Sequence, residues 1–294
     1  MTRLADQGFL QLGQTRLEYR MIGPRPDAAP TLVLLHEGLG CVAGWGAFPQ
    51  ELAAATGTGV FVYSRAGYGN SSPVKLPRPV SFMHEEALEV LPRLLDAIAV
   101  RRGLLVGHSD GASIAAIYAG SIQDHRVRGL VLIAPHFFTE DMGLAEIRRT
   151  KAAFEAGPLR AKLARWHADP DNAFNAWCGP WLDPEFRKWE LGDELAHIRV
   201  PILIVQGEND QYGTVRQIEM AQQECYCPVD VALLPNTQHA PHREAPEATL
   251  RATSEFINRL LREHHEGDMA AQNRAVQSSA AAGRRNRRSQ TSAR

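Results

Sequence analysis

Four short, continuous apolar runs constrain the fold of this chain more than any other feature of its sequence. They are Thr31–Leu35, Val60–Tyr63, Leu104–Val106 and Leu130–Ala134. Because the runs are continuous rather than alternating, both faces of each strand must be covered, as in a parallel sheet under helices. Amphipathic stretches separate them, at about Trp45–Ala55, Phe82–Val100 and Ala112–Ile122. Strand alternating with helix predicts an α/β fold with a doubly wound, mostly parallel sheet.

The same pattern resumes near the C-terminal end. Ile202–Val205 and Val229–Leu234 are further apolar runs, and a final helix is expected from about Ala245 to Arg262. Residues 8–22 form two alternating stretches around a Gly-Gln turn, which predicts an antiparallel hairpin at one edge of the sheet. The sequence therefore predicts a core domain from residues 1–134 and 200–266, with about eight strands flanked by helices.

The regularity breaks between residues 135 and 199, where no strand-like run occurs. Nine of the 21 aromatic residues lie in this segment: Phe137, Phe138, Phe154, Trp166, Phe174, Trp177, Trp181, Phe186 and Trp189. We interpret the segment as an inserted helical cap over the carboxyl edge of the sheet, where open α/β sheets bind ligands. Most of the aromatics are expected to hold the insertion together, and two or three to line a pocket.

The composition excludes several classes of protein. Hydrophobic residues make up 44% and charged residues 22% of the 294, which rules out a wholly disordered or collagenous chain. Residues 269–294 hold six arginines and no acid, so the rest of the chain carries all 33 acids against 26 Lys and Arg. This acidic balance argues against a nucleic-acid-binding face. Residues 267–294 lack periodicity and are predicted to form a disordered basic tail.

Cysteines and apolar stretches bear on location. Four cysteines are too few for a disulfide scaffold and lack zinc-knuckle spacing, so we expect free thiols in a reducing compartment. The N-terminus has no apolar leader region, and no stretch is long enough to cross a membrane. We therefore expect a cytoplasmic protein without a membrane partner.

The segment Gly107-His108-Ser109-Asp110-Gly111 is the first candidate site. It follows the run Leu104–Val106 and opens a predicted helix, the setting in which a serine lies on a strained turn with Oγ above the sheet. Glycines are needed where strand and helix pass closest. The alternative is a glycine-rich turn with an incidental serine.

A serine hydroxyl needs a general base and an acid that orients it. In this arrangement both are expected later in the chain, with the acid first. Asp210 follows the run Ile202–Val205, with Glu208 as the alternative acid. We prefer His239 as the base because it lies in the loop after the last strand. His242 is then a structural or pocket-wall residue, whereas His264 and His265 lie at the end of the final helix.

Acyl transfer also needs amide donors for the developing oxyanion. The Asp110 N–H at the start of the helix is one candidate. The other is the N–H of Gly38, in the glycine-rich turn after Thr31–Leu35. This turn lacks both the G-x-G-x-x-G pattern and a P-loop lysine, which argues against a phosphate site.

Several spaced motifs now occur in a fixed order: LLHEGLG, YSRAGYGNSSP, VGHSDG, QGEND and NTQHAPHRE. In this order the chain resembles the α/β-hydrolase superfamily, in its small cap-bearing branch, over about residues 8–264. The resemblance implies a helical cap after the sixth strand, a triad of Ser109, Asp210 and His239, and no cofactor; we also expect no metal. A serine nucleophile disfavours the haloalkane dehalogenase and epoxide hydrolase branches.

The chain departs from the family pattern at two acids. Glu37 stands where His is usually followed by Gly, and Asp110 stands where Met or Gly often follows the nucleophile. If both face the site, neutral or cationic esters should be preferred over anionic ones. Alternatively, Glu37 is neutralised by Arg65 or bonded within its loop, and Asp110 caps its helix. Candidate substrate-binding residues are Glu37, His242 and Trp177.

These features predict a serine hydrolase that cleaves a small carboxylic ester or related acyl substrate through an acyl-enzyme. One alternative is a C–C bond hydrolase of aromatic-ring cleavage products, which calls for a cap arginine such as Arg148, Arg149 or Arg165 directed at the site. Another is a ligand receptor that keeps the triad. The expected partner is a small molecule, with no nucleic acid; the oligomeric state stays open.

Overall fold

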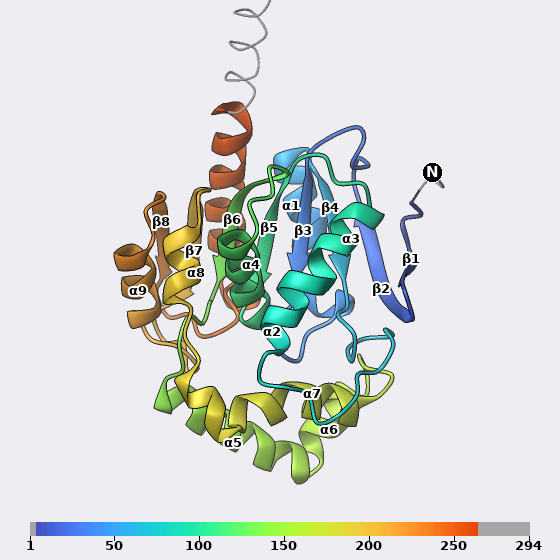
Figure 1. Ribbon diagram of the computed structural model, residues 1–294, viewed down its shortest axis with the longest axis vertical. Coiled ribbons are helices and arrows are strands. Elements are labelled where there is room, and N and C mark those ends of the chain that lie inside the picture. The colour runs from blue at the N-terminus through green and yellow to red at the C-terminus, as the bar shows by residue number, and fades with distance from the viewer. Residues whose placement is uncertain (1–3, 264–294) are drawn as a thin grey trace, which may run out of the picture. The chain divides into compact units, whose positions relative to one another are not determined.

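The computed structural model describes residues 4–263, and its centre is an eight-stranded sheet in the order β1-β2-β4-β3-β5-β6-β7-β8 (Figure 1). The β1–β2 and β2–β4 pairs are antiparallel, and every pair from β4 to β8 is parallel. The predicted fold class is confirmed, including the hairpin at one edge. The strands are β1 (Gln7–Leu12), β2 (Thr15–Ile22), β3 (Thr31–Leu35), β4 (Gly59–Tyr63), β5 (Gly103–His108), β6 (Val127–Ile133), β7 (Ile202–Gly207) and β8 (Val229–Leu234).

Burial explains the continuous apolar runs. Every residue of β3, β4, β5 and β7 is buried, because these strands have a neighbour on each side and helices on both faces. The hairpin strands β1 and β2 instead alternate between more and less exposed positions. Strand β8 lies at the other edge, and its Val231 and Leu233 are exposed despite the apolar sequence.

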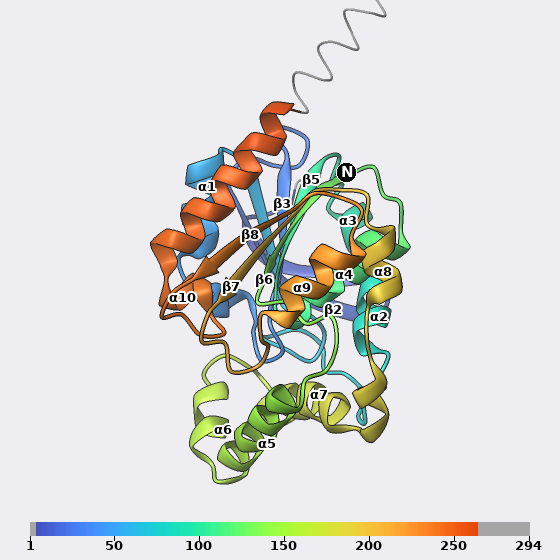
Figure 2. The same cartoon turned by 90° about the vertical axis from the view of Figure 1, so that its left-hand side faces the viewer.

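Helices cover both faces of the sheet (Figure 2). Helix α1 lies on one face, and α3, α4, α8 and α9 lie on the other. The bounds are η1 (Val42–Trp45), α1 (Phe48–Thr56), α2 (Phe82–Glu85), η2 (Glu86–Val90), α3 (Leu91–Ala97), α4 (Asp110–Ser121), α8 (Gly192–His197), α9 (Arg216–Glu224) and α10 (Pro241–Glu244), and residues 246–263 are also helical.

The stretch predicted as one helix over Phe82–Val100 is divided by a π turn, η2. Pro92 stands at the start of α3 and has no N–H to donate to the preceding turn. The helix widens in the residues just before it, and Glu86 in this turn is buried against Arg78, with the two side chains 2.9 Å apart.

The segment between β6 and β7 contains the aromatic-rich helices. They are α5 (Asp141–Glu155), α6 (Pro158–Leu163), α7 (Pro170–Leu182) and η3 (Pro184–Lys188). They lie beyond the carboxyl ends of the strands, at the bottom of Figure 1. Phe154 stacks on Phe174 with ring centroids 3.9 Å apart, and Trp181 packs edge-on against Phe186 at 4.8 Å.

One part of residues 135–199 does not lie over the edge. Helix α8 packs on α4, on a face of the sheet (Figure 2). The two helices approach so closely that a Cβ on Gly120 would lie 2.2 Å from the Glu194 carbonyl oxygen. Buried Leu195 and Ile198 make this contact favourable. The predicted boundary at residue 199 therefore includes a helix that packs with the core.

The sheet, the helices named up to α10 and the candidate site lie in one compact unit that ends at Ser254. None of the helices in residues 4–263 combines the length and apolar character that a membrane span requires. The predicted tail, residues 267–294, lies outside the described residues, as do His264 and His265.

Candidate active site

The candidate residues come from loops that follow five neighbouring parallel strands. Gly38 follows β3, Ser109 follows β5, His136 follows β6, Asp210 follows β7 and His239 follows β8. Parallel strands end at the same edge of a sheet, so these loops meet there, between the sheet and helices α5 and α7 (Figure 1).

Ser109 lies on a strained turn between β5 and α4. Its φ of 54° and ψ of −120° belong to a region that residues with a side chain rarely adopt. The flanking glycines make the turn possible: a Cβ on Gly107 would lie 2.3 Å from the Gly111 carbonyl oxygen, and one on Gly111 would lie 2.1 Å from the Leu35 carbonyl oxygen. The turn therefore excludes side chains at both positions.

Ser109, His239 and Asp210 form a hydrogen-bonded chain. His239 Nε2 is 2.9 Å from Ser109 Oγ, and His239 Nδ1 is 2.9 Å from each carboxylate oxygen of Asp210. An ionised carboxylate only accepts hydrogen bonds, so Nδ1 carries the proton and Nε2 is left as the acceptor for the serine hydroxyl. The arrangement can remove a proton from Ser109 when its Oγ attacks.

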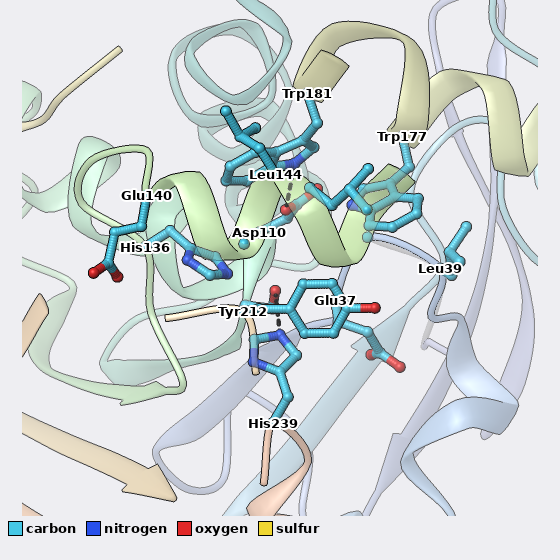
Figure 3. Close-up of a pocket in the computed structure, with 14 residues that line it drawn as sticks. Glu37, Leu39, Asp110, His136, Glu140, Leu144, Trp177, Trp181, Tyr212 and His239 are labelled. Carbon is cyan, nitrogen blue, oxygen red and sulfur yellow. Dashed lines mark hydrogen bonds between the residues drawn. The ribbon is translucent and has the colours of Figure 1, made fainter. Parts of the chain in front are cut away.

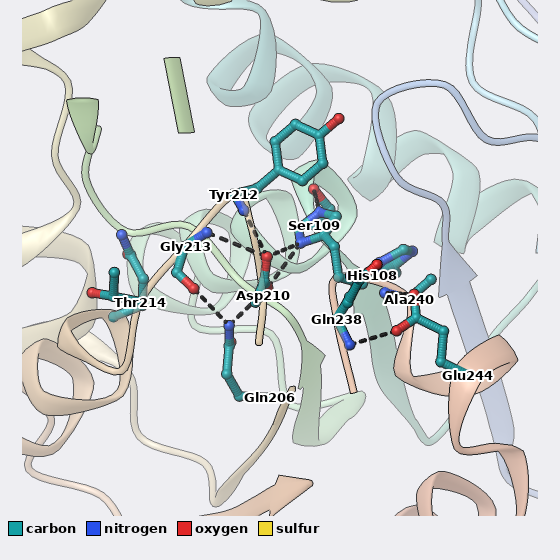
Figure 4. Close-up of polar contacts among 12 residues, drawn as sticks. His108, Ser109, Gln206, Asp210, Tyr212, Gly213, Thr214, Gln238, Ala240 and Glu244 are labelled. Carbon is teal, nitrogen blue, oxygen red and sulfur yellow. Dashed lines mark hydrogen bonds and ion pairs between the residues drawn. The ribbon is translucent and has the colours of Figure 1, made fainter. Parts of the chain in front are cut away.

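Asp210 is held from several sides (Figure 4). Gln206 Nε2 donates to Oδ2 at 2.8 Å, and the N–H of Tyr212 donates to Oδ1 at 2.8 Å. Burial raises the pKa of Asp210, but His239 and the Tyr212 N–H outweigh it and hold that pKa below its usual value. The carboxylate thus stays ionised beside the imidazole. Glu208, the alternative acid, is exposed.

Two cavities meet at His239. The inner cavity has a volume of about 130 Å³ and includes Ser109 and Asp110 (Figure 3). The segment over the sheet edge contributes an apolar part of its wall: Leu144, Ile147, Trp177 and Trp181. The outer cavity, of about 600 Å³, shares Glu37, Leu39, Tyr212 and His239 with the inner one and adds Trp166, Arg149, Lys162 and Arg243. Three aromatics of the insertion thus line cavities.

Gly38 and Asp110, the candidates for oxyanion donors, both line the inner cavity beside Ser109. Gly38 lies directly against the indole of Trp177, because a Cβ there would be only 2.1 Å from Trp177 Cδ1. Glycine at this position lets the ring close the cavity over the loop.

Glu37 lines both cavities but has partners. Arg243 Nη2 lies 3.1 Å from its Oε1, and His108 Nδ1 lies 3.4 Å from its Oε2. Burial raises the pKa of Glu37, but the contacts with His108 and Arg243 outweigh it and hold the pKa well below the usual value. Arg65, which the sequence analysis considered as the partner of Glu37, is not paired with its carboxylate. The Arg65 guanidinium instead donates to the carbonyl oxygens of His36 and Glu37.

Asp110 is buried, with 1% of its surface exposed. Its Oδ1 accepts a hydrogen bond of 3.1 Å from Trp181 Nε1 (Figure 3). Burial raises the pKa of Asp110, and Arg65 and the Trp181 hydrogen bond oppose that effect only in part. Asp110 thus lines the inner cavity as a buried residue with one hydrogen-bonded carboxyl oxygen.

His242 does not reach either cavity. It is 4% exposed and packs against Trp45 at 5.0 Å and His108 at 4.8 Å, between ring centroids. Burial, followed by the neighbouring His108, holds its pKa well below the usual value. The structure places His242 in the core and not on a pocket wall.

The candidate cap arginines do not enter the inner cavity. Arg149 lines the outer cavity and is paired with Glu146, and neither Arg148 nor Arg165 lines either of the two cavities. Within residues 4–263, no cluster of three or more His, Cys, Asp or Glu side chains is arranged to hold a metal ion.

Sequence reasoning missed three residues of the site: His136, Trp181 and Tyr212. The His136 ring lies 5.2 Å from Trp181, and the Tyr212 ring lies 4.6 Å from His239. Burial, with a smaller effect of His239, lowers the pKa of His136 to about 3, so it is neutral. The sequence held a signal for two of them. His136 lies just after an apolar run, and Tyr212 lies two residues after Asp210.

Comparisons with known proteins identify the family and several relatives. Residues 32–252 match the Alpha/beta hydrolase family. A proline iminopeptidase of Lactobacillus helveticus is 32% identical over 231 residues, which cover 65% of this chain and 78% of that protein. The 3-oxoadipate enol-lactonase 1 of Acinetobacter baylyi is 24% identical over 253 residues, covering 80% of this chain and 91% of the relative.

Solved structures show the same architecture. A membrane phospholipase A superposes with a TM-score of 0.71 at 25% identity and covers 86% of each chain. The enol-lactonase from Burkholderia xenovorans LB400 superposes with a TM-score of 0.67 at 20% identity, covering 85% of this chain and 99% of the other. The chain therefore belongs to the alpha/beta hydrolase family and is a hydrolase.

Proposed function

We propose that the protein is a serine hydrolase that cleaves a small carboxylic ester through an acyl-enzyme. The observation that carries this proposal is the chain of 2.9 Å contacts from Ser109 through His239 to Asp210 beside the inner cavity. Both hydrogen bonds have the length that general-base activation of a serine requires.

The proposed reaction follows from these positions. Ser109 Oγ attacks the ester carbonyl carbon while His239 Nε2 takes its proton. The N–H groups of Gly38 and Asp110 stabilise the negative oxygen of the tetrahedral intermediate. His239 then protonates the leaving alcohol, and water cleaves the acyl-enzyme with His239 again as the base. Asp210 keeps the imidazole oriented and stabilises its charged form.

The two cavities supply a direction for the substrate. The leaving oxygen must lie next to His239 Nε2 to receive its proton. Of the two cavities Ser109 lines only the inner one, whereas His239 lines both, so in this proposal the acyl group extends inward and the alcohol outward. The inner volume of about 130 Å³ favours a small acyl group, and the outer one of about 600 Å³ accepts a larger alcohol. In this proposal residues 135–190 act as the cap.

Amide hydrolysis is the second candidate. The relative at 32% identity is named a proline iminopeptidase, and the same triad chemistry cleaves amides. The C–C hydrolase alternative has less support, because the part of the inner cavity wall that the structure describes contains no Lys or Arg to bind a carboxylate. The four cysteines are free, which supports a reducing, cytoplasmic location.

Ser109→Ala tests the proposal. We expect it to abolish hydrolysis of a panel of neutral esters and covalent labelling by a fluorophosphonate, because the attacking hydroxyl is gone. Thermal unfolding should stay nearly unchanged. Labelling of another serine in the variant would refute the assignment, and a wild type that binds esters without turnover would favour the receptor alternative.

A further inference from the structure

The inner cavity contains one carboxyl oxygen without a hydrogen-bond partner. Asp110 Oδ1 is bonded to Trp181, but Oδ2 is buried and unpartnered. A buried acceptor without a donor is costly, and such exceptions are concentrated where a ligand completes the set. Both Asp110 and Ser109 line this cavity, into which the proposed acyl group extends.

The other acids of the cavity wall are already satisfied. Glu140 accepts hydrogen bonds from Thr214 at 2.7 and 2.8 Å and from Gln217 at 2.9 Å. Glu37 is paired with Arg243 and His108. Asp110 is thus the acid of this wall that has an oxygen available to a substrate.

The charges around Asp110 leave it suited to a cation. The charged side chains that the structure shows on the inner wall are the acids Glu37, Asp110 and Glu140. Burial raises the pKa of Asp110, and the groups that oppose this effect include His239, Arg65, which donates to backbone carbonyls, and Arg78, which is paired with Glu86. These arginines and an incoming cation both favour the ionised carboxylate.

We infer that Asp110 Oδ2 binds the ammonium group of the acyl moiety, so that the preferred substrates are esters of small α-amino acids. This inference rests on the proposed ester hydrolysis. Asp110 directly follows the nucleophile, which places its carboxylate beside the substituents of the acyl α-carbon. The indole rings of Trp177 and Trp181 line the same cavity, and aromatic rings can stabilise a nearby cation. An acyl carboxylate would instead meet Asp110 without a positive partner on the wall.

Three benzyl esters test this assignment: those of L-alanine, L-lactate and propionate, which present an ammonium, a hydroxyl and a methyl group at one position. They are assayed near pH 6.5, below the pKa of an α-amino group. Asp110→Asn keeps an acceptor for Trp181 but removes the charge. We expect it to lower the ratio of kcat/KM for the alanine ester to that for the propionate ester at least tenfold. Comparing ratios between proteins cancels the intrinsic reactivity of each ester.

Glu140→Gln is the matched control, because it removes the charge of an acid in the same wall whose oxygens are engaged. Its ratio should equal that of the wild type. An unchanged ratio in Asp110→Asn would overturn the inference, as would an equal sensitivity of the lactate ester to Asp110→Asn. Both results leave ester hydrolysis intact, whereas a wild type that cleaves none of the three esters contradicts the proposed function itself.

A second measurement needs no variant. Propylammonium and 1-propanol have the same size and differ in charge. Propylammonium should inhibit propionate ester hydrolysis by the wild type with a Ki at least tenfold lower than that of 1-propanol. Equal inhibition constants would refute the ammonium site even if Asp110→Asn failed to fold.

Discussion

The inner and outer cavities each contain an acid that departs from the family sequence pattern, and the two acids have different surroundings. Glu37, which lines both cavities, is paired with Arg243 and close to His108. Asp110, on the inner side, has one oxygen bonded to Trp181 and the other unpartnered. A carboxylate at an active site can select substrate charge only where the protein has not already neutralised it. From the sequence alone, Glu37 and Asp110 were equally good candidates for selecting substrates by charge.

Two histidines near the site also differ in their surroundings, and this contrast carries the largest predicted effect. His239→Ala should lower kcat by about 10³-fold or more, because Ser109 loses its proton acceptor. His242→Phe should keep kcat within about threefold, since both ring nitrogens of His242 are buried without hydrogen-bond partners and its neighbours are aromatic.

Steady-state kinetics on a neutral ester, with circular dichroism to verify folding, measures this difference. A loss of activity in His242→Phe as large as in His239→Ala would contradict the assignment of His239 as the catalytic base and of His242 as a core residue.

A second prediction concerns the wall of the inner cavity. Gly38→Ala should lower kcat/KM by about 10- to 100-fold, because its Cβ would meet the Trp177 ring at 2.1 Å and displace either the ring or the oxyanion loop. Gly179→Ala, in the same helix as Trp177, is the control: nothing lies within 4 Å of its Cβ, and activity should persist. Wild-type kinetics in Gly38→Ala would mean that the loop does not contribute a donor.

The third prediction uses the buried imidazole of the inner cavity. His136 has a pKa of about 3 in the folded protein, against about 6.5 when unfolded. The unfolded state therefore binds the proton between these values, and stability falls as the pH drops below 6.5. Between pH 7.5 and pH 5 this costs about 2 kcal/mol.

His136→Phe removes this titration while keeping an aromatic ring beside Trp181. Urea unfolding at both pH values should show the wild type losing about 2 kcal/mol more than the variant. Other buried histidines, such as His36 and His242, are present in both proteins, so their contributions to the pH dependence of stability cancel in the comparison. Equal losses would mean that His136 is not buried in its neutral form.

Local sequence patterns predicted the parts of the fold that depend on neighbouring residues. The bounds of β3 and β8 agree with their apolar runs. Burial on both faces explains the continuous pattern of β3, whereas β8 is an edge strand that is mostly half-buried or exposed. The turn at Ser109 was predictable for a similar reason, since its glycines are required by contacts of the turn itself with Gly111 and Leu35.

The unpredicted features are contacts between distant residues. Arg243 and Glu37 are 206 residues apart, so no periodicity links them, and the nearer Arg65 was the natural guess. The position of α8 on the sheet depends on Gly120 of another helix. Burial of His242 likewise depends on Trp45 and Phe48, which reach it only in the folded chain. Partner identity, and with it the charge state of each acid, required the structure.

The smallest predicted effect tests whether the charge of Glu37 influences which substrates are preferred. Glu37→Gln should leave the alanine-to-propionate ester ratio unchanged, in contrast to Asp110→Asn, because the Glu37 charge already faces Arg243. The pKa of Glu37 is lowered by folding, so its ion pair contributes stability at neutral pH that is lost in acid. Since Arg243 is 39% exposed, that contribution is limited to about 1 kcal/mol or less, measured by urea unfolding at pH 7. If Glu37→Gln shifted the ester ratio as much as Asp110→Asn, Glu37 would also select substrates by charge. Pairing with a cation would then not explain the difference between the two acids.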